Sequence, residues 1–288
     1  MTGKALVLGA GGVLGVAWEA GILAALAEAG VDVTKAELIG GTSAGSVVGS
    51  HIACGRTAQE LLDEQFAPRE GGIETQIQAD ISFLMSLFQK WAGLPQITPQ
   101  ACAEIGAMAL AARTMPEASW VDSFAQALPA QWPERPLLLT AVDAETGAFQ
   151  TWERGAVVDL PRAVASSCAV PGLFPPVRIN GRRYMDGGVR SGTSADLAQG
   201  YDNVLIIAPI GAKADGIDPL LGRATRAEAE ALRAAGSTVE LLMPDAAALQ
   251  AIGINRMDAA RRPQAAEAGV AQGKALASRL DGWTKVPA

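Results

Sequence analysis

A serine flanked on both sides by small residues is the first candidate for chemistry in this chain. It stands in the motif Gly41-Thr42-Ser43-Ala44-Gly45, between an apolar run at Ala36–Ile39 that predicts a buried strand and a stretch at Ala44–Ala53 that predicts a helix. A sharp strand-to-helix turn exposes the serine hydroxyl at a helix N-terminus, where partial positive charge favours a developing anion. The motif indicates nucleophilic chemistry at Ser43. The alternative is a turn rich in glycine and serine that only caps a helix.

A glycine-rich loop follows the first predicted strand, with the sequence Gly9-Ala10-Gly11-Gly12-Val13-Leu14-Gly15. Successive backbone N–H groups in such a loop can hold an anion or an oxyanion. A dinucleotide site is a second interpretation, with glycines at positions 9, 11 and 15 and Asp32 as the ribose ligand. A tight turn that lets a helix pack closely on a strand is the third. The loop alone does not decide among the three.

An aspartate lies on a glycine-flanked loop in the motif Tyr184-Met185-Asp186-Gly187-Gly188. The motif comes directly after Asn180-Gly181, which predicts a two-residue hairpin turn between Val177–Ile179 and Arg182–Tyr184. Small neighbours leave the carboxylate of Asp186 free to project towards a reacting group. In isolation the motif favours a simpler interpretation, an aspartate that accepts a hydrogen bond from its own backbone.

The chain has one histidine, and its position bears on the mechanism. His51 comes eight residues after Ser43 within the same predicted helix, which places it about 12 Å further along the helix axis. We therefore expect His51 to be a packed or solvated helix residue, out of reach of the Ser43 hydroxyl. The base for Ser43 must then be a carboxylate or a lysine.

Strand and helix patterns alternate around these motifs. Further strands are predicted at Lys4–Leu8, Pro136–Val142, Phe149–Trp152, Asn203–Ala208 and Val239–Met243. Further helices are predicted at Val16–Ala29, Ile81–Leu94 and Gln100–Arg113, after the capping boxes Thr57-Ala-Gln-Glu60 and Thr225-Arg-Ala-Glu228, and in the alanine-rich C-terminal region. This order predicts an α/β protein with a mostly parallel sheet. We expect a single domain over residues 1–288, with a helical insertion at about 67–135.

Composition excludes several classes of protein. The 288 residues are 49% hydrophobic and 18% charged, with a net charge of −7, which is typical of a globular protein and argues against nucleic-acid binding. Cys54, Cys102 and Cys168 show neither metal-site spacing nor a disulfide pattern, as expected in a reducing compartment. No signal peptide or membrane-spanning segment is predicted, so we expect a soluble, cytoplasmic protein.

Together the motifs resemble those of the patatin-like phospholipases. The similarity rests on the glycine loop, the serine motif, the stretch Ala165–Pro176 and Asp186-Gly187-Gly188, which occur in the order of that family. Leu14 stands where the family usually has a basic residue, and the usual Asn-x-Pro after the aspartate motif is absent here.

The resemblance implies a three-layer α/β fold and a Ser43–Asp186 dyad that cleaves acyl esters of lipids. It also implies an oxyanion hole formed by the N–H groups of Gly11, Gly12 and Val13, with Ala44 as a further donor. The resemblance implies no metal and no other cofactor.

Two other functions remain open at this stage, a nucleotide-binding oxidoreductase and an inactive lipid-binding protein of the same fold. For the lipid interpretation, an apolar stripe within Ile81–Leu94 offers candidate substrate contacts at Phe83, Phe88 and Trp91. Ordinary core packing of a cap helix is the alternative for this stripe. We also expect a transient contact with a membrane surface.

Overall fold

A mixed, mostly parallel β-sheet forms the centre of the molecule. The computed structural model describes residues 3–68, 81–94, 96–211, 220–280 and 283. Within these residues the strand order is β5-β6-β3-β2-β1-β7-β8, and β4 also pairs with β3. The strands β1, β2, β3, β7 and β8 are parallel, while β4, β5 and β6 run antiparallel to their neighbours. Their bounds are β1 Lys4–Leu8, β2 Leu38–Gly41, β3 Leu137–Asp143, β4 Phe149–Trp152, β5 Val177–Ile179, β6 Arg182–Asp186, β7 Asn203–Ile207 and β8 Thr238–Leu242.

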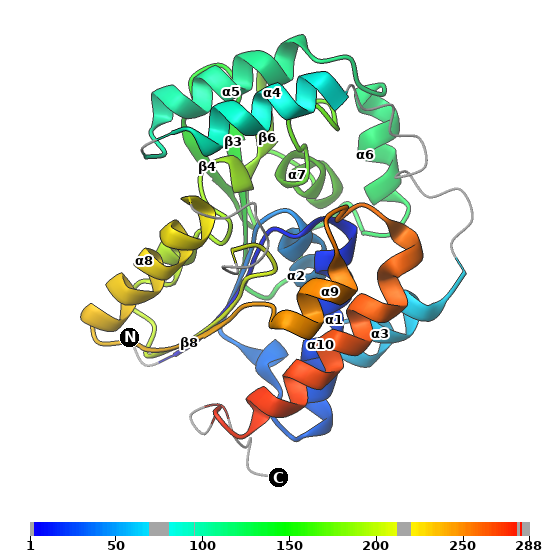
Figure 1. The fold of residues 1–288 in the computed structure, drawn as a ribbon, viewed down its shortest axis with the longest axis vertical. Helices are drawn as coiled ribbons and strands as arrows, with labels where there is room; N and C mark the ends of the chain where they lie inside the picture. Colours follow the sequence, from blue (N-terminus) through cyan, green and yellow to red (C-terminus); the bar gives the residue numbers. More distant parts are fainter. Residues whose placement is uncertain (1–2, 69–80, 95, 212–219, 281–282, 284–288) are drawn as a thin grey trace.

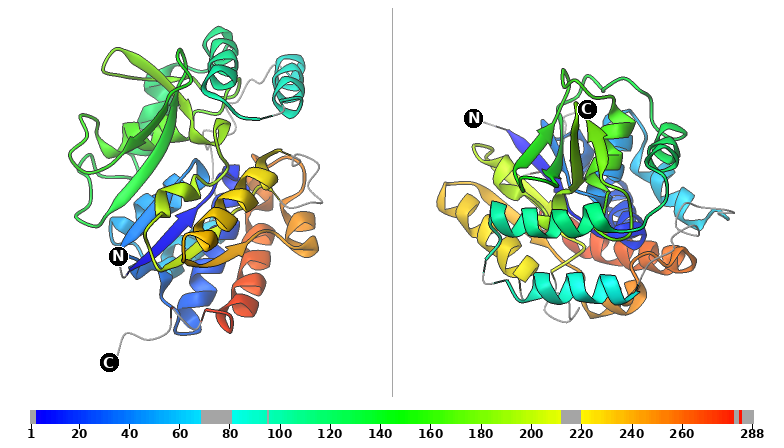
Figure 2. Two further views of the ribbon diagram at one scale, coloured as in Figure 1. Left: turned by 90° about the vertical axis from the view of Figure 1, so that its left-hand side faces the viewer. Right: turned by 90° about the horizontal axis from the view of Figure 1, so that it is seen from above.

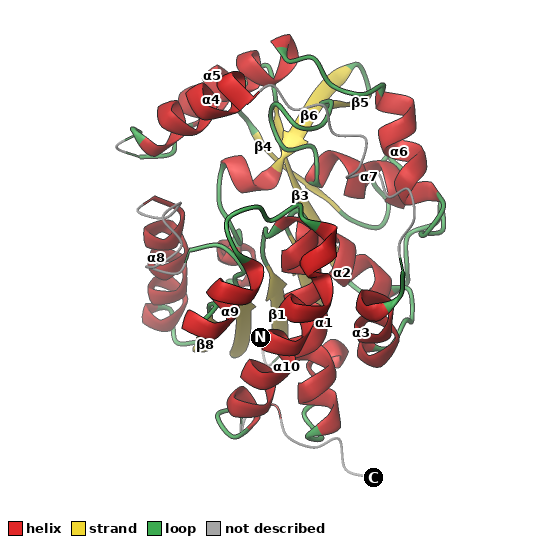
Figure 3. Ribbon diagram, turned by 45° about the vertical axis from the view of Figure 1, so that its right-hand side comes forward, coloured by secondary structure: helices red, strands yellow, loops and turns green. Residues whose placement is uncertain are grey.

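Helices cover both faces of the sheet, which confirms the predicted three-layer architecture. The helices α1, α2, α3 and α10 lie on one face and α8 lies on the other (Figures 1 and 3). The bounds of the helices are α1 Gly12–Glu28, α2 Ala44–Ala53, α3 Ala58–Phe66, α4 Ile81–Ala92, α5 Pro99–Ala111, α6 Glu117–Ala125, α7 Leu160–Ser167, α8 Leu220–Ala234, α9 Ala246–Ile252 and α10 Arg262–Ala277.

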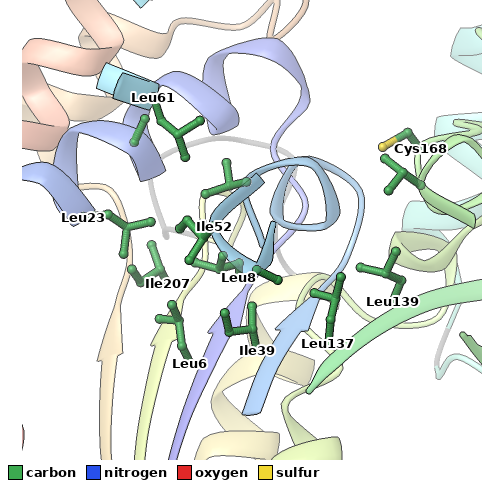
Figure 4. Packing of buried hydrophobic residues seen from close by; sticks show 14 of the residues in the cluster. Leu6, Leu8, Leu23, Ile39, Ile52, Leu61, Leu137, Leu139, Cys168 and Ile207 are labelled. Atoms are coloured by element: carbon green, nitrogen blue, oxygen red, sulfur yellow. The ribbon is translucent and has the colours of Figure 1, made fainter. Parts of the chain in front are cut away.

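The main core lies between the sheet and the layer of α1, α2 and α10. Leu6, Leu8, Ile39 and Ile207 point from neighbouring strands towards Ile52 and Leu23 on the helices (Figure 4). Alternate residues of the same strands, such as Val7 and Ile206, face a second core that α8 closes with Ala229 and Leu232. Burial on both faces explains why these strands are almost continuously apolar in sequence.

Glycines bring α1 and α10 into unusually close contact. A Cβ atom on Gly21 would overlap the backbone of Ala266, and one on Gly269 would overlap the backbone of Trp18. The Trp18 indole also donates a hydrogen bond to the side-chain oxygen of Gln272 at 2.9 Å. This pairing holds α1 in place, and the first turn of α1, from Gly12, is part of the glycine-rich loop.

The segment expected to be a helical insertion contains three helices among its described residues. It contains α4, α5 and α6, and α4 and α5 lie at the same end of the molecule as the β5–β6 hairpin (Figure 2). Leu87 of α4 and Ile105 of α5 belong to a small core with Val142, Met185 and Val189. The insertion thus packs against the strands and loop that surround Asp186.

The two capping boxes predicted from sequence have different outcomes. The capping box at Thr57 and Glu60 is confirmed, because the Thr57 side chain accepts a hydrogen bond from the Glu60 N–H and Glu60 reciprocates. The second capping box, at Thr225 and Glu228, is wrong. Both residues lie well inside α8, and the side chain of Glu228 bonds to a distant loop. A Thr-x-x-Glu spacing also occurs within helices, where residues three apart share a face.

Candidate active site

Ser43 occupies a strained turn between β2 and α2. Its backbone has φ 54° and ψ −114°, a conformation that is uncommon for a residue with a side chain. The flanking glycines are required by space. A Cβ atom on Gly41 would lie 2.6 Å from the Gly45 oxygen, and one on Gly45 would overlap the carbonyl group of Leu8. The small residues of the motif therefore permit the sharp turn that was predicted from sequence.

Side chains at the end of α7 hold the main chain of Ser43. The Ser43 N–H donates to the Ser167 hydroxyl oxygen at 3.0 Å, and the Ser43 carbonyl accepts from the Cys168 thiol at 3.2 Å. The Ser46 hydroxyl donates to the same carbonyl at 2.6 Å. Burial and the nearby carboxyl of Asp186 raise the pKa of the Cys168 thiol, so the thiol remains a donor. The positions of Ser167 and Cys168 were noted in the sequence, but their role depends on a contact with a segment more than 120 residues away.

Asp186 is the last residue of β6 and faces the same point. Strand β6 pairs with β3, which places Asp186 opposite Ala141. The Asp186 N–H donates to the Ala169 carbonyl at 3.0 Å. Carboxyl oxygen Oδ1 of Asp186 accepts a hydrogen bond from the Gly188 N–H at 2.7 Å. This is the hydrogen bond to the neighbouring backbone that the sequence motif favours. A Cβ atom on Gly187 would overlap the side chain of Thr140, so this position also requires glycine.

The second carboxyl oxygen of Asp186 is available for chemistry. Oδ2 is buried and has no hydrogen-bond partner among the described residues. Burial raises the pKa of Asp186 from 3.8 to about 7, while the hydroxyl of Ser43 and the N–H of Gly188 act in the opposite direction. The Ser43 hydroxyl acts on the Asp186 carboxyl, and the two residues are 5% and 4% exposed, so the pair is largely screened from water.

The glycine-rich loop joins this site at the N-terminus of α1. The Gly9 carbonyl accepts the Gly45 N–H at 2.9 Å, which ties the loop to the serine turn. In the part of the chain that the structure describes, the N–H groups of Gly11, Gly12, Val13 and Ala44 have no acceptor. The N-termini of α1 and α2 lie beside each other here, and both favour negative charge. The arrangement suits an oxyanion.

Other segments hold the loop in place. The Gly9 N–H donates to Oε1 of Glu19 at 3.0 Å, and the Ala10 N–H donates to the carbonyl of Gly192 at 2.7 Å. The Leu14 N–H donates to the Arg256 carbonyl at 3.0 Å. The Leu14 side chain is fully buried, so the position usually occupied by a basic residue is part of the core here. Sequence reasoning did not identify Glu19, Gly192 or Arg256, because their contacts with the loop are tertiary.

The remaining candidates from sequence fall outside this group. His51 lies in the last turn of α2, at the opposite end of the helix from Ser43, and burial and Arg56 lower its pKa to about 4. Asp32, the candidate ribose ligand, accepts the Thr34 N–H at 3.2 Å and pairs with Lys35. Among the described residues, no cluster of three or more histidine, cysteine, aspartate or glutamate side chains could hold a metal ion.

The aromatic stripe of α4 is placed only in part. Phe83 and Trp91 are partly buried and pack against the small core around Ile105 and Met185. The side chain of Phe88 lies outside the described part of the structure. This packing agrees with the cap-helix interpretation of the first two residues, while a contact with substrate stays a prediction for all three. No helix in the described ranges is long and apolar enough to cross a membrane.

Comparison with known proteins identifies the family of this chain. The family model described as patatin-like phospholipase matches residues 6–198, which is more than half of the chain and includes the glycine loop, Ser43 and Asp186. The chain belongs to the patatin-like phospholipase family. A search of solved structures finds the crystal structure of type III effector protein ExoU at 16% identity, with a TM-score of 0.35. That match covers 95% of this chain and 53% of the other, so this patatin-like chain spans about half the length of ExoU.

Proposed function

We propose that this chain hydrolyses acyl ester bonds of lipids, with Ser43 as nucleophile and Asp186 as the general base. The observation that carries the proposal is a strained, buried serine whose hydroxyl acts on the buried carboxyl of Asp186, where Oδ2 has no other partner among the described residues. A base works best when its pKa is close to the working pH, and burial raises the pKa of this carboxyl to about 7. Membership of the patatin-like phospholipase family supports a lipid as the substrate.

The reaction proceeds in two similar halves. Oγ of Ser43 attacks the ester carbonyl carbon while its proton passes to Oδ2 of Asp186, and the carbonyl π electrons move onto the oxygen. The tetrahedral intermediate collapses, and the leaving alcohol takes the proton from Asp186, leaving an acyl-serine. Water then attacks the acyl carbon with the same proton transfers, which release the fatty acid and restore Ser43.

The oxyanion formed in each half is bound by backbone donors. We assign this role to the N–H groups of Gly11, Gly12 and Val13, with the Ala44 N–H as a further donor. These groups have no acceptor among the described residues, and they are fixed in position before the reaction begins. The loss of one such donor typically costs about 2.7–4 kcal/mol of transition-state stabilisation. The buried Leu14 side chain contributes no charge to this site.

A fluorophosphonate reagent and two variants test the proposal. The wild type should be labelled at Ser43 and should release fatty acid from phospholipid vesicles or from a p-nitrophenyl ester. Ser43→Ala and Asp186→Asn should each reduce turnover by at least about a thousandfold, and the double variant should be little worse, since the two groups act as a unit. A folded protein that is not labelled, as expected of an inactive lipid-binding member of the family, would overturn the proposal.

A further inference from the structure

Glu228 of α8 binds the loop that follows Asp186. Its Oε1 accepts the Ser191 hydroxyl at 2.6 Å, and its Oε2 accepts the Thr193 hydroxyl at 2.8 Å and the Ala195 N–H at 2.9 Å. One side chain thus bonds to three residues within five positions of the loop. Glu228 lies beyond residue 198, where the match to the family model ends.

The Ser191 hydroxyl that bonds to Glu228 also forms the bonds inside the loop. The Ser191 hydroxyl oxygen accepts the N–H groups of Thr193 at 3.2 Å and Ser194 at 2.8 Å, so its own proton is directed to Glu228. Ser194 has a left-handed backbone with φ 51°, which needs support from its surroundings. The bond from the Ala195 N–H to Glu228 holds the residue that follows Ser194 directly.

The same loop touches all three parts of the candidate active site. It continues directly from Asp186, and the Ser191 N–H donates to the Gly187 carbonyl at 3.2 Å. The Gly192 carbonyl accepts the Ala10 N–H from the glycine loop at 2.7 Å. The Thr193 carbonyl accepts the Thr42 hydroxyl, next to the nucleophile, at 3.4 Å.

We infer that Glu228 is a positioning residue, which sets the placement of the base loop and the glycine loop relative to Ser43. This inference rests on the proposed function, because it assigns Glu228 a role in the same reaction. Glu228 touches neither Ser43 nor Asp186 in any contact that the structure gives, so its effect passes through the loop at 191–195.

The role requires a carboxylate rather than an amide. All three partners of Glu228 are donors, and the Ala195 N–H cannot reverse its polarity. A glutamine would have to place its oxygen there and its NH₂ group towards Ser191. The Ser191 oxygen already accepts two N–H groups, so it has no lone pair left for a third donor. Glu228→Gln therefore breaks the bond to Ser191 with almost no change in shape.

Kinetics and hydrogen exchange of Glu228→Gln test the inference, with Glu230→Gln as the matched control. Glu230 lies on the same helix, and its side chain is 71% exposed. With a p-nitrophenyl butyrate substrate, Glu228→Gln should lower kcat about 10–100-fold, because a small misplacement of the reacting groups costs up to about a hundredfold in rate. KM should change less than about twofold, because the loop aligns the reacting groups rather than binding substrate. Glu230→Gln should match the wild type.

The pH profile separates positioning from general loss of stability. The pKa of Asp186 is high because the group is buried, so a loosened loop that admits water should shift the acid limb of kcat/KM from about pH 7 towards lower pH. Burial raises the pKa of Glu228, and the variant removes this titrating group, while its charged neighbours Arg190 and Asp196 are unaltered. Ser43 and Cys168 face Asp186 and are also unaltered. Thr193→Val keeps the Glu228 carboxyl, so the acid limb must shift in the same direction in that variant. A variant that was only less stable would lose activity, but the acid limb of its kcat/KM profile would stay at the same pH.

Amide hydrogen exchange supplies an arm that does not depend on activity. Exchange at residues 191–195 should be at least about tenfold faster in Glu228→Gln than in the wild type or Glu230→Gln. If the glutamine variant fails to fold, Thr193→Val removes one donor to Glu228 and should give the same three changes in weaker form. If the wild type is active and Glu228→Gln has the same kcat, the same acid limb and the same exchange rates at 191–195, the positioning role is overturned and the proposed function stands. A wild type without Ser43-dependent hydrolysis overturns the proposed function, while the exchange arm still decides whether Glu228 holds the loop.

Discussion

Replacing Asp186 with asparagine should make the protein more stable at alkaline pH, by an amount that follows from the buried carboxyl. The pKa of Asp186 is about 7 in the folded chain, against an ordinary value of 3.8. The folded protein therefore binds this proton more tightly than the unfolded chain does, and the wild type loses stability as the pH rises between these two values. At 1.36 kcal/mol for each pH unit, the complete loss is about 4 kcal/mol. Asparagine is neutral at every pH, so the variant does not undergo this loss of stability.

Urea unfolding of both proteins at pH 5 and pH 8 measures this effect. By pH 5 the wild type has lost less than half of this stability and by pH 8 nearly all of it, so the advantage of the asparagine variant should grow by about 2–3 kcal/mol. All other groups titrate in both proteins and cancel in the difference. Asp122→Asn, at an exposed position on α6, is the control and should follow the wild type at both pH values.

If the wild type and Asp186→Asn differed in free energy of unfolding by the same amount at both pH values, the reasoning would be refuted. If the advantage of Asp186→Asn changed by less than about 0.5 kcal/mol between pH 5 and pH 8, the carboxyl would not hold its proton in the folded state. Asp186 would then titrate as an ordinary aspartate, and burial would give no reason for it to serve as the proposed base near pH 7. The measurement needs no substrate, so it tests the electrostatics of the site separately from its catalysis.

Three further predictions concern the turn, the histidine and the insertion. Gly45→Ala should lower the free energy of unfolding by about 1–3 kcal/mol or prevent folding, since its Cβ atom overlaps strand β1, whereas Gly40→Ala meets nothing within 4 Å and should be mild in a thermal-unfolding comparison. His51→Gln should keep most of the turnover, and a loss of about a thousandfold without loss of stability would point to a triad instead. Replacement of Phe83, Phe88 or Trp91 by alanine should, for at least one of the three, reduce hydrolysis of long-chain esters and leave hydrolysis of butyryl esters unchanged. If all three variants lost activity equally at every chain length, in proportion to their loss of stability, α4 would be a packing element.

Local patterns in the sequence predicted much of the fold and the centre of the site. The strand, turn and helix around Ser43 are encoded within residues 36–53, and the predicted bounds of α2 match the structure. The hairpin at Asn180-Gly181 was predictable because both residues adopt positive φ, which few other residue pairs do readily. The Ser43–Asp186 pairing came from the resemblance to a family, since nothing local links residues so far apart in the chain.

Features that depend on tertiary contacts could not be predicted. Glu228 follows a threonine at the spacing of a capping box, and only the fold shows that its side chain bonds to the loop at 191–195. The helix Leu160–Ser167 was not identified, because its eight residues include a proline and small polar residues. The high pKa of Asp186 arises from burial by segments from across the chain, which no short motif specifies.

The buried position of the only histidine has a consequence for inhibitors. Many covalent inhibitors of serine hydrolases form one bond to the serine and a second to an imidazole beside it. In this protein the group beside Ser43 is a carboxyl, and His51 is 8% exposed at the far end of α2. We expect reagents that need both bonds, such as chloromethyl ketones, to leave the enzyme active, while reagents that react with the serine alone inactivate it. That difference in sensitivity would allow this activity to be measured in a mixture with hydrolases that use a histidine.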